Sequence, residues 1–452
     1  MKRLIAITLL IGLMQAGFGY SLLNREAGDM VRNFDARTAG MGSASVAGGL
    51  SLLDGVVNPA NIGLMDAALQ LQASAYVAKN NDDRSLPMYN FFDSYVGDAT
   101  YATNANFFDD YTFALKYALQ LDDLRLAVAL SHRPVVNFYS EYDEQVRNDA
   151  NSNYEEYPPI IARNSIDGKG RIQAGGMQIA LSYTDMISAG IGVNYLYGDT
   201  SLRRRIVWAD AAYDLVSGST NLQDADFSLK RDFDAAIQLS GGITYRVSQR
   251  FVLAGSYTAK TELDATLSGN ENGVLLDSLA TASNLHDAYD TYTLPAEIRA
   301  GVRYEPRNIM RTYFNADVRF VKWSDVSSRY DDVLNYYCGV EHRFASSLPL
   351  RMGFMYETTY TTVDEDGIVY GQEITTPGFS LGTGFAVLPK VTVDVAAQFN
   401  YRTYECLDLF MDSFYDYPEL WNEIEPADRG WDKPDTVKET TVGLTTSISY
   451  KW

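Results

Sequence analysis

Few residues of this chain have the types and spacing that catalysis or metal binding requires. The three histidines, His132, His286 and His342, are not spaced with one another or with a cysteine as metal ligands are. Ser131 and His132 are adjacent, and neighbouring side chains on a strand point to opposite faces, so they are excluded as a hydrolytic pair. The sequence therefore predicts a protein that is not an enzyme and that holds neither a metal nor a cofactor.

Two further features have more than one interpretation. Asp364-Glu365-Asp366-Gly367 offers carboxylates that suit a divalent cation, but an Asp-Gly hairpin turn explains the motif more simply. Cys338 and Cys406 are the only cysteines, and a disulfide between them is compatible with an oxidising compartment. Because they fall on different predicted strands, the sequence leaves their pairing open.

The elements that would position any site are strands. From Val391 to Tyr404, apolar residues alternate with polar ones such as Asp394 and Gln398, which is the period of a strand with one apolar face. The same pattern recurs from Ala67 to the end of the chain. It predicts about 14 strands, at 67–79, 111–120, 124–133, 175–185, 187–197, 231–247, 250–262, 294–306, 309–323, 333–345, 348–361, 377–388, 390–404 and 437–452.

The connections between these strands alternate between short and long. Short turns, such as Asp122-Asp123, alternate with the long connections 80–110, 134–174, 198–230, 263–293, 324–332, 362–376 and 405–436. Transmembrane β-barrels have this asymmetry, and they also lack the apolar run of about 20 residues that a membrane helix needs. The sequence therefore predicts an all-β fold: an antiparallel transmembrane β-barrel of about 14 strands over residues 67–452.

Two segments precede the predicted barrel. Residues 1–19 have a basic start, a short apolar core and small residues at the end, which predicts a secretory signal peptide. Residues 20–66 contain a glycine-rich, largely apolar stretch without a strand or helix period, including Gly40 and Gly42. Glycines allow close approach to another surface, so we expect this segment to form a hatch inside the barrel. Within it, Asn58, Pro59 and Ala60 predict a tight turn.

The last strand carries a second targeting feature. Val442, Leu444, Ile448, Tyr450 and Trp452 share one face, and an aromatic residue ends the chain. This pattern resembles the C-terminal signal that the outer-membrane barrel assembly machinery recognises. Tyr450 and Trp452 are therefore the candidate assembly signal of a protein of the outer membrane of a diderm bacterium, with outer-membrane lipids and lipopolysaccharide around it.

Several segments together resemble the FadL/TodX family of outer-membrane transporters for long-chain fatty acids and other hydrophobic compounds. They are Ala36-Arg-Thr-Ala-Gly-Met-Gly-Ser-Ala44 with Asn58-Pro-Ala60, Leu294-Pro-Ala-Glu-Ile-Arg-Ala-Gly-Val-Arg-Tyr304, Asp317-Val-Arg-Phe-Val-Lys-Trp323, Gly339-Val-Glu-His-Arg343 and Leu350-Arg-Met-Gly-Phe354. The resemblance implies passive uptake: a hydrophobic ligand passes the hatch, gated by residues such as Gly40, Gly42 and Asn58-Pro59-Ala60, and leaves sideways through an irregular strand. Pro134 is the candidate for that lateral exit, since proline marks an edge, an end or a bulge; the alternative is that it merely ends its strand.

Two sets of residues are candidate ligand contacts. Phe91, Phe92, Phe107 and Phe108, in and after the first long connection, could form an apolar capture groove. Arg299 and Arg303 face the predicted lumen and could hold a carboxylate head group, or they could instead neutralise carboxylates of the wall.

A second function remains open. The chain also resembles PorV-type barrels, which dock or shuttle secreted proteins, and its polar, acidic connections suit protein binding. A formal net charge of -21 argues against nucleic acid as a partner, because phosphate contacts need lysine and arginine.

Overall fold

The computed structural model describes residues 23, 28–32, 34–48, 51–92, 94–148, 159–216, 221–272, 291–307, 311–328, 330–344, 348–360, 373–406, 408–410, 412–415, 417, 420 and 434–452. The predicted signal peptide, His286 and the Asp364–Gly367 motif lie outside these residues. In the described part, no helix is both long and apolar enough to cross a membrane.

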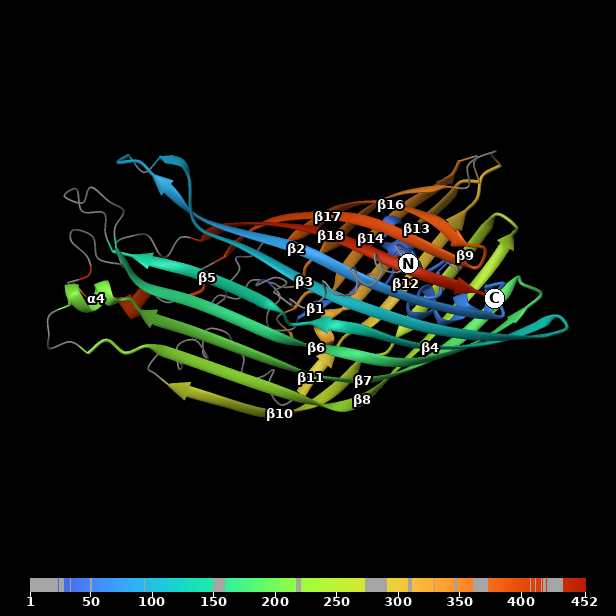
Figure 1. Ribbon diagram of the computed structural model, residues 1–452, viewed down its shortest axis with the longest axis horizontal. Coiled ribbons are helices and arrows are strands. Elements are labelled where there is room, and N and C mark those ends of the chain that lie inside the picture. The colour runs from blue at the N-terminus through green and yellow to red at the C-terminus, as the bar shows by residue number, and fades with distance from the viewer. Residues whose placement is uncertain are drawn as a thin grey trace.

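The wall is a closed antiparallel barrel of 14 staves (Figure 1). Three staves are each interrupted once and consist of two strands: β4 with β5, β9 with β10, and β11 with β12. Pairing of β18 with β2 closes the ring. The strands are β2 (Leu69–Tyr89), β3 (Tyr95–Leu121), β4 (Leu124–Asn137), β5 (Ser140–Arg147), β6 (Ile160–Tyr183), β7 (Ile187–Trp208), β8 (Ala225–Ser248), β9 (Phe251–Thr258), β10 (Thr261–Asn272), β11 (Thr291–Leu294), β12 (Ala296–Tyr304), β13 (Tyr313–Lys322), β14 (Val333–Arg343), β15 (Pro349–Thr358), β16 (Thr375–Leu388), β17 (Val391–Cys406) and β18 (Asp435–Lys451).

The predicted number of strands is confirmed, but several strands are longer than predicted. The connections predicted at 80–110, 134–174 and 198–230 are largely strand, and the link between β2 and β3 is only 90–94. Beyond the membrane neither face of a strand needs to be apolar, so alternation of hydrophobicity no longer marks these extensions.

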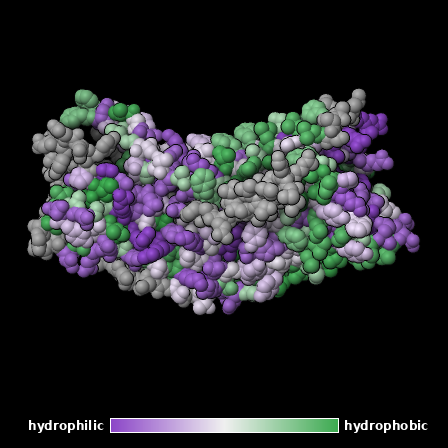
Figure 2. Space-filling model, viewed as in Figure 1, coloured by the Kyte–Doolittle hydropathy of each residue, from purple (hydrophilic) through white to green (hydrophobic). Residues whose placement is uncertain are grey.

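In the half of the barrel where the C-terminus lies, the outer surface is apolar and the side that faces the lumen is polar. Figure 2 shows much of the hydrophobic surface in a band toward that end, with hydrophilic residues at its tip and over much of the opposite half. Exposed apolar side chains of this belt alternate with buried polar ones along each strand: in β17, Phe399 is 45% exposed and Gln398 only 3%. A surface of this kind matches the acyl chains of a bilayer. We call the short-turn end with Trp452 the turn end and the opposite end the loop end.

The hatch segment, Asp29 to Leu64, lies inside the barrel at the turn end (Figure 1). It consists of β1 (Asp29–Met30), α2 (Ala36–Gly40), α3 (Asp54–Val57) and the 3-10 helix η1 (Pro59–Leu64). Helix α2 packs on β15 to β18, and η1 packs on β4, β6, β7 and β8 on the other side of the lumen. The remaining described helices, α4 (Asp210–Leu215), η3 (Trp323–Asp325) and η4 (Asp412–Tyr415), lie in connections.

Candidate functional site

Two side-chain caps fix the local structure of the hatch segment. Asp35 begins α2, where its Oδ1 accepts hydrogen bonds from the backbone N–H of Arg37 at 2.8 Å and of Thr38 at 3.0 Å. Asn58 begins η1 in the same way, accepting from Ala60 N at 3.1 Å, and Pro59 takes the first helical position, where no N–H is needed. The predicted Asn-Pro turn is therefore a helix start.

Close backbone contact holds the hatch segment against the wall. Gly42 has a φ of 62°, and a Cβ at this position would lie 2.6 Å from the backbone oxygen of Cys338. Gly353 of β15 is the wall partner, since a Cβ there would lie 1.9 Å from Gly42 N. Gly40 lies close to Gly382 of β16: a Cβ added at Gly40 would lie 3.1 Å from the Gly382 Cα. Gly42 and Gly353 leave no room for a side chain and the Gly40–Gly382 contact is tight, so the hatch is seated on a glycine-lined strip of wall.

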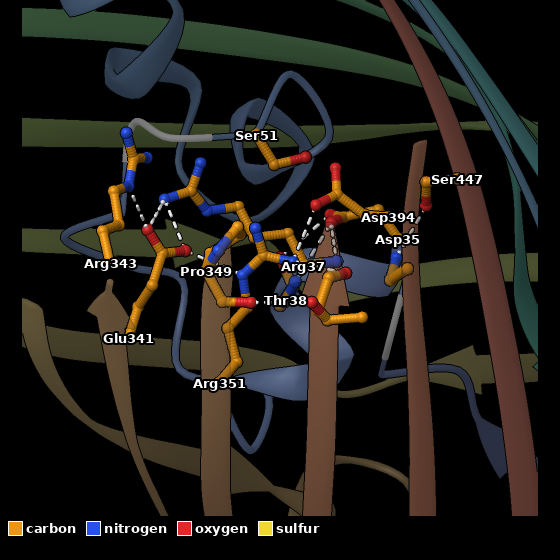
Figure 3. A network of polar contacts seen from close by, with 12 residues as sticks. Asp35, Arg37, Thr38, Ser51, Glu341, Arg343, Pro349, Arg351, Asp394 and Ser447 are labelled. Carbon is orange, nitrogen blue, oxygen red and sulfur yellow. Dashed lines mark hydrogen bonds and ion pairs between the residues drawn. The ribbon is translucent and has the colours of Figure 1, made fainter. Parts of the chain in front are cut away.

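Charged groups join α2 to the same part of the wall (Figure 3). Arg37 pairs with Glu341 of β14 at 2.8 Å, and the same carboxylate receives Arg351 at 2.7 Å and Arg343 at 2.9 Å. Arg351 also reaches Asp394 of β17 at 2.7 Å. A fully buried carboxylate that accepts from three guanidinium groups is compensated, and removing one partner from such a buried network is costly.

The predicted ligand arginines take part in wall and hatch contacts. Arg303 faces the lumen, and its guanidinium donates to the backbone oxygen of Gly48. Arg299 pairs with Glu297, which also receives Arg319 at 2.7 Å. Asp317 accepts hydrogen bonds from the backbone N–H of the hatch residues 45 and 46, at 2.5 and 2.8 Å. Arg299 therefore neutralises a carboxylate of the wall, whereas Arg303 holds a backbone oxygen of the hatch segment.

A lumen cavity lies beside β1 of the hatch segment. Its lining has an apolar side and a charged side, formed by Asp29, Met30, Arg32, Arg319, Val321, Trp323, Val333, Asn335, Glu357, Thr358, Thr359, Tyr360 and Thr376. The rings of Trp323 and Tyr360 are stacked with centroids 3.8 Å apart. On the charged side, Arg32 pairs with Glu357. The cavity has a volume of only about 40 Å³, so a molecule larger than a few waters would fit only if the elements around it moved.

The barrel wall has a break in its backbone pairing next to β1. The ladder between β3 and β4 ends at Phe113 and His132, and beyond this point β3 pairs only with β2 among the described strands. β4 continues to Asn137, paired to β6 with a bulge between Pro134 and Val136. The interpretation of Pro134 as a strand end is therefore wrong, and the proline lies at a bulge at the edge of this wall gap. Further out, only side chains bridge β3 and β5 in the described part, such as Asn106 Nδ2 donating to the backbone oxygen of Glu141 at 2.7 Å.

The wall gap is filled from inside and crossed by an ion pair. Arg171 of β6 contacts Asp110 of β3 at 2.8 Å, although the β4–β5 stave lies between their strands. On the lumen side β1 pairs with β4, with Met30 opposite Val136. Thr112 donates to the backbone oxygen of Phe34 at 2.5 Å. Among the described residues, this ion pair and the start of the hatch segment both span the gap.

The four predicted phenylalanines do not form one groove. Phe91 and Phe92 lie at the tip of the β2–β3 hairpin, 98% and 82% exposed. Phe107 and Phe108 are adjacent on β3, so Phe107 points outward while Phe108 is 1% exposed in the lumen, near Tyr76. The expectation of a single capture patch is wrong, because residues 107–108 lie on a strand rather than in a loop.

The remaining candidate residues take part in ordinary structural contacts. Tyr450 lies on β18, and Trp452 at the seam exchanges backbone hydrogen bonds with Leu69 of 2.8 and 3.3 Å. Cys338 is exposed and Cys406 buried, and both are free. His132 bonds to Tyr197 at 3.0 Å and His342 to Thr312 at 2.8 Å. The described residues contain no cluster of histidine, cysteine, aspartate and glutamate placed to bind a metal.

Comparison with known proteins gives likeness in structure but not in sequence. No protein-family model and no curated protein matches the chain. The solved structure of a Pseudomonas aeruginosa FadL homologue matches with a TM-score of 0.61 and 14% identity, over 94% of this chain and 100% of that one. The Ralstonia pickettii toluene transporter TbuX matches with a TM-score of 0.52 and 15% identity, over 93% and 99% of the two chains. The Pseudomonas putida toluene transporter TodX matches with a TM-score of 0.51 and 14% identity, over 94% and 99%. The barrel described above thus has the fold of the FadL and TodX structures.

Proposed function

We propose that this protein is a passive outer-membrane channel for hydrophobic molecules such as long-chain fatty acids. Three observations support the proposal: the fold shared with the FadL-homologue, TbuX and TodX structures, the apolar outer belt, and a buried N-terminal segment that packs on strands on both sides of the lumen. TbuX and TodX are described as toluene transporters. Since a closed lumen stops free diffusion of water-soluble compounds, a ligand would have to move part of the hatch.

The observation that carries the proposed route is the position of β1. Asp29 and Met30 line the lumen cavity and also pair with Asn137 and Val136 at the wall gap. Only two residue pairs form this ladder, so it is the shortest strand pairing among the described strands. Displacing β1 would join the cavity to the wall gap, and the ligand would leave sideways into the membrane without entering the aqueous periplasm.

The residues around the cavity suit a ligand with both apolar and polar parts, which would fit only after β1 has moved and enlarged the space. Trp323, Tyr360 and Val321 offer apolar contact, while Arg32 and Arg319 supply positive charge near carboxylates that already pair with them. A fatty acid has a matching division between tail and head group. A PorV-like docking role would need neither the cavity nor the wall gap, so these features favour transport.

A reversible crosslink tests the route. Met30→Cys with Val136→Cys, in a background with Cys338 and Cys406 replaced by serine, places two thiols on directly opposed residues of β1 and β4. Oxidation should block uptake of a radiolabelled long-chain fatty acid by cells or vesicles, and a reductant should restore it. The matched control is the pair Ala127→Cys and Ala180→Cys, which joins β4 to β6 without touching β1. Undiminished uptake with β1 locked would refute exit past this strand.

The nature of the ligand needs a separate measurement. Native mass spectrometry of the detergent-extracted protein, with lipid extraction of what co-purifies, should reveal a bound fatty acid or similar apolar molecule. An empty barrel that instead retains a secreted protein would favour the docking role.

A further inference from the structure

The charged side chains of the turn end are divided between two sides of the ring. The connections after β3 and β6 carry Asp122, Asp123 and Asp185, and the base next to them, Arg125, pairs with Asp185 at 3.1 Å. The following short connections around the ring, after β8, β12, β14 and β16, carry or adjoin bases instead. These bases, which we call the basic crescent, are Arg250, Arg307, Arg311, Arg343 and Lys390.

The basic crescent has the opposite sign to the chain as a whole, whose formal net charge is -21. Glu305 is the only acidic side chain in the connections that carry the crescent. Arg343 pairs with the buried Glu341 at 2.9 Å, whereas Arg307 and Lys390 are exposed. A run of exposed bases with a single acid between them gives this side of the turn end a positive field in an acidic protein.

The crescent adjoins the edge of the apolar belt. Exposed apolar side chains lie within three residues of its bases along the chain: Val247, Tyr304, Phe314, Phe344 and Leu388. Lysine and arginine have apolar stems that lie along such a surface while the charged group extends into water. Short turns of outer-membrane barrels face the periplasm. The bases are therefore placed to reach lipid head groups of the leaflet on that side.

Aromatic rings mark the depth of this edge in the membrane. Trp452 is 68% exposed, and the Lys390 Nζ lies over its ring at 4.2 Å from the centroid. On the same side of the barrel, the Arg343 guanidinium lies over the ring of Tyr313 at 5.6 Å. Tryptophan and tyrosine gather at the boundary between lipid and water because one end of each ring is apolar and the other polar. A base on the face of such a ring lies at the depth of the head groups.

The shape of the crescent favours lipid over an acidic protein as its partner. Its bases lie on successive connections around the ring, so they follow the edge of the bilayer in an arc rather than forming a compact patch. A protein would have to extend along the whole arc to contact all of them. Separate lipid molecules can each approach one base while their acyl chains stay on the apolar belt.

We propose that the basic crescent binds the head groups of anionic phospholipids and gathers these lipids around the side of the barrel from β8 to β17. The acidic side is left to lipids without net charge. Asp122 and Asp123 join β3 to β4, the strands between which the wall gap lies, so the crescent draws anionic lipid away from that gap. Binding of lipid by the crescent does not depend on the proposed transport.

Quenching of tryptophan by brominated lipid measures which lipid lies beside the crescent. The protein is placed in vesicles of brominated phosphatidylglycerol with unlabelled phosphatidylethanolamine, and in the reverse mixture. The difference between wild type and Trp452→Phe, which keeps an aromatic residue at the end of the chain, isolates Trp452 from the other four tryptophans. Phosphatidylglycerol should be favoured at Trp452 about fivefold or more, because each base near an anionic lipid surface contributes about that factor.

A second reporter supplies a matched control in the same molecule. Leu121→Trp, combined with Trp452→Phe, places a tryptophan at an exposed position next to Asp122, where phosphatidylglycerol should not be favoured. Arg307→Gln with Lys390→Gln should lower the preference at Trp452 several-fold. Lys169→Gln with Lys230→Gln removes two exposed bases of the loop end and should leave it unchanged.

Equal preference at the two reporters would overturn the proposal, and so would a preference at Trp452 that persists when the crescent bases are removed. An acidic protein would then be the partner to seek. If the double variant does not fold, Arg307→Gln alone keeps the test valid with a smaller expected decrease. Loss of fatty-acid uptake with an intact lipid preference would count against the proposed function alone, and intact uptake without the preference would count against this inference alone.

Discussion

Replacing Gly353 with alanine should loosen the hatch while leaving the barrel intact. The added Cβ would lie 1.9 Å from Gly42 N and 2.4 Å from Gly42 Cα. Both are backbone atoms, so no change of rotamer relieves the clash and the hatch must move away from β15. Overpacking of this kind costs about 1–3 kcal/mol, and about 2 kcal/mol would raise the population of displaced hatch roughly 30-fold.

Ion conductance across a planar bilayer measures this displacement. The wild type should be closed most of the time, because the hatch fills the lumen, and Gly353→Ala should show frequent openings. Gly175→Ala is the matched control, since no atom lies within 4 Å of the Cβ it would add on β6. Wild-type conductance of a folded Gly353→Ala barrel, with folding checked by heat-modifiable migration on a gel, would refute the seating of the hatch on this glycine strip.

Three further predictions concern the wall gap, the loop end and the hatch. Asp110→Asn with Arg171→Met removes the ion pair across the gap without leaving a buried charge; fatty-acid uptake should rise several-fold, and unchanged uptake would show that the pair does not limit exit. Burial, together with Asp408 of the adjoining connection, raises the pKa of Glu144 from 4.5 to about 7. The packing of the β17–β18 connection against β5 is then most stable below pH 4.5 and loses stability as the pH rises to about 7, so the amides of residues 408–410 should exchange hydrogen faster over this range, by at most about tenfold per pH unit beyond the intrinsic change. Glu144→Gln should abolish this dependence on pH. A dependence that persisted in the variant would show that another group titrates. Asp35→Ala removes a helix cap worth about 1 kcal/mol, so amides of α2 should exchange hydrogen about fivefold faster, whereas equal rates in Asp35→Ala and wild type would contradict the capping role.

The sequence by itself determined the architecture of the wall. Each strand of the apolar belt has one face toward lipid and the other toward the lumen. The alternation around Phe399 and Gln398 could therefore be read from the sequence. The alternation of short and long connections predicted that one end of the barrel carries short turns and the other end long connections. The glycine-rich stretch around Gly42 predicted a segment in close contact with another surface, and the Asn58-Pro59 pair predicted its turn.

Tertiary structure alone decided how this barrel is closed. The wall gap depends on where the β3–β4 ladder stops, and the pair Asp110–Arg171 joins two strands that are not neighbours in the sheet. Phe414, from the connection after β17, likewise stacks on Trp208 of β7, although five staves separate β17 from β7. Periodicity reports which face a residue occupies, since each strand repeats every two residues. Contacts across the lumen depend instead on the registers of all the staves together, which no single stretch of sequence encodes.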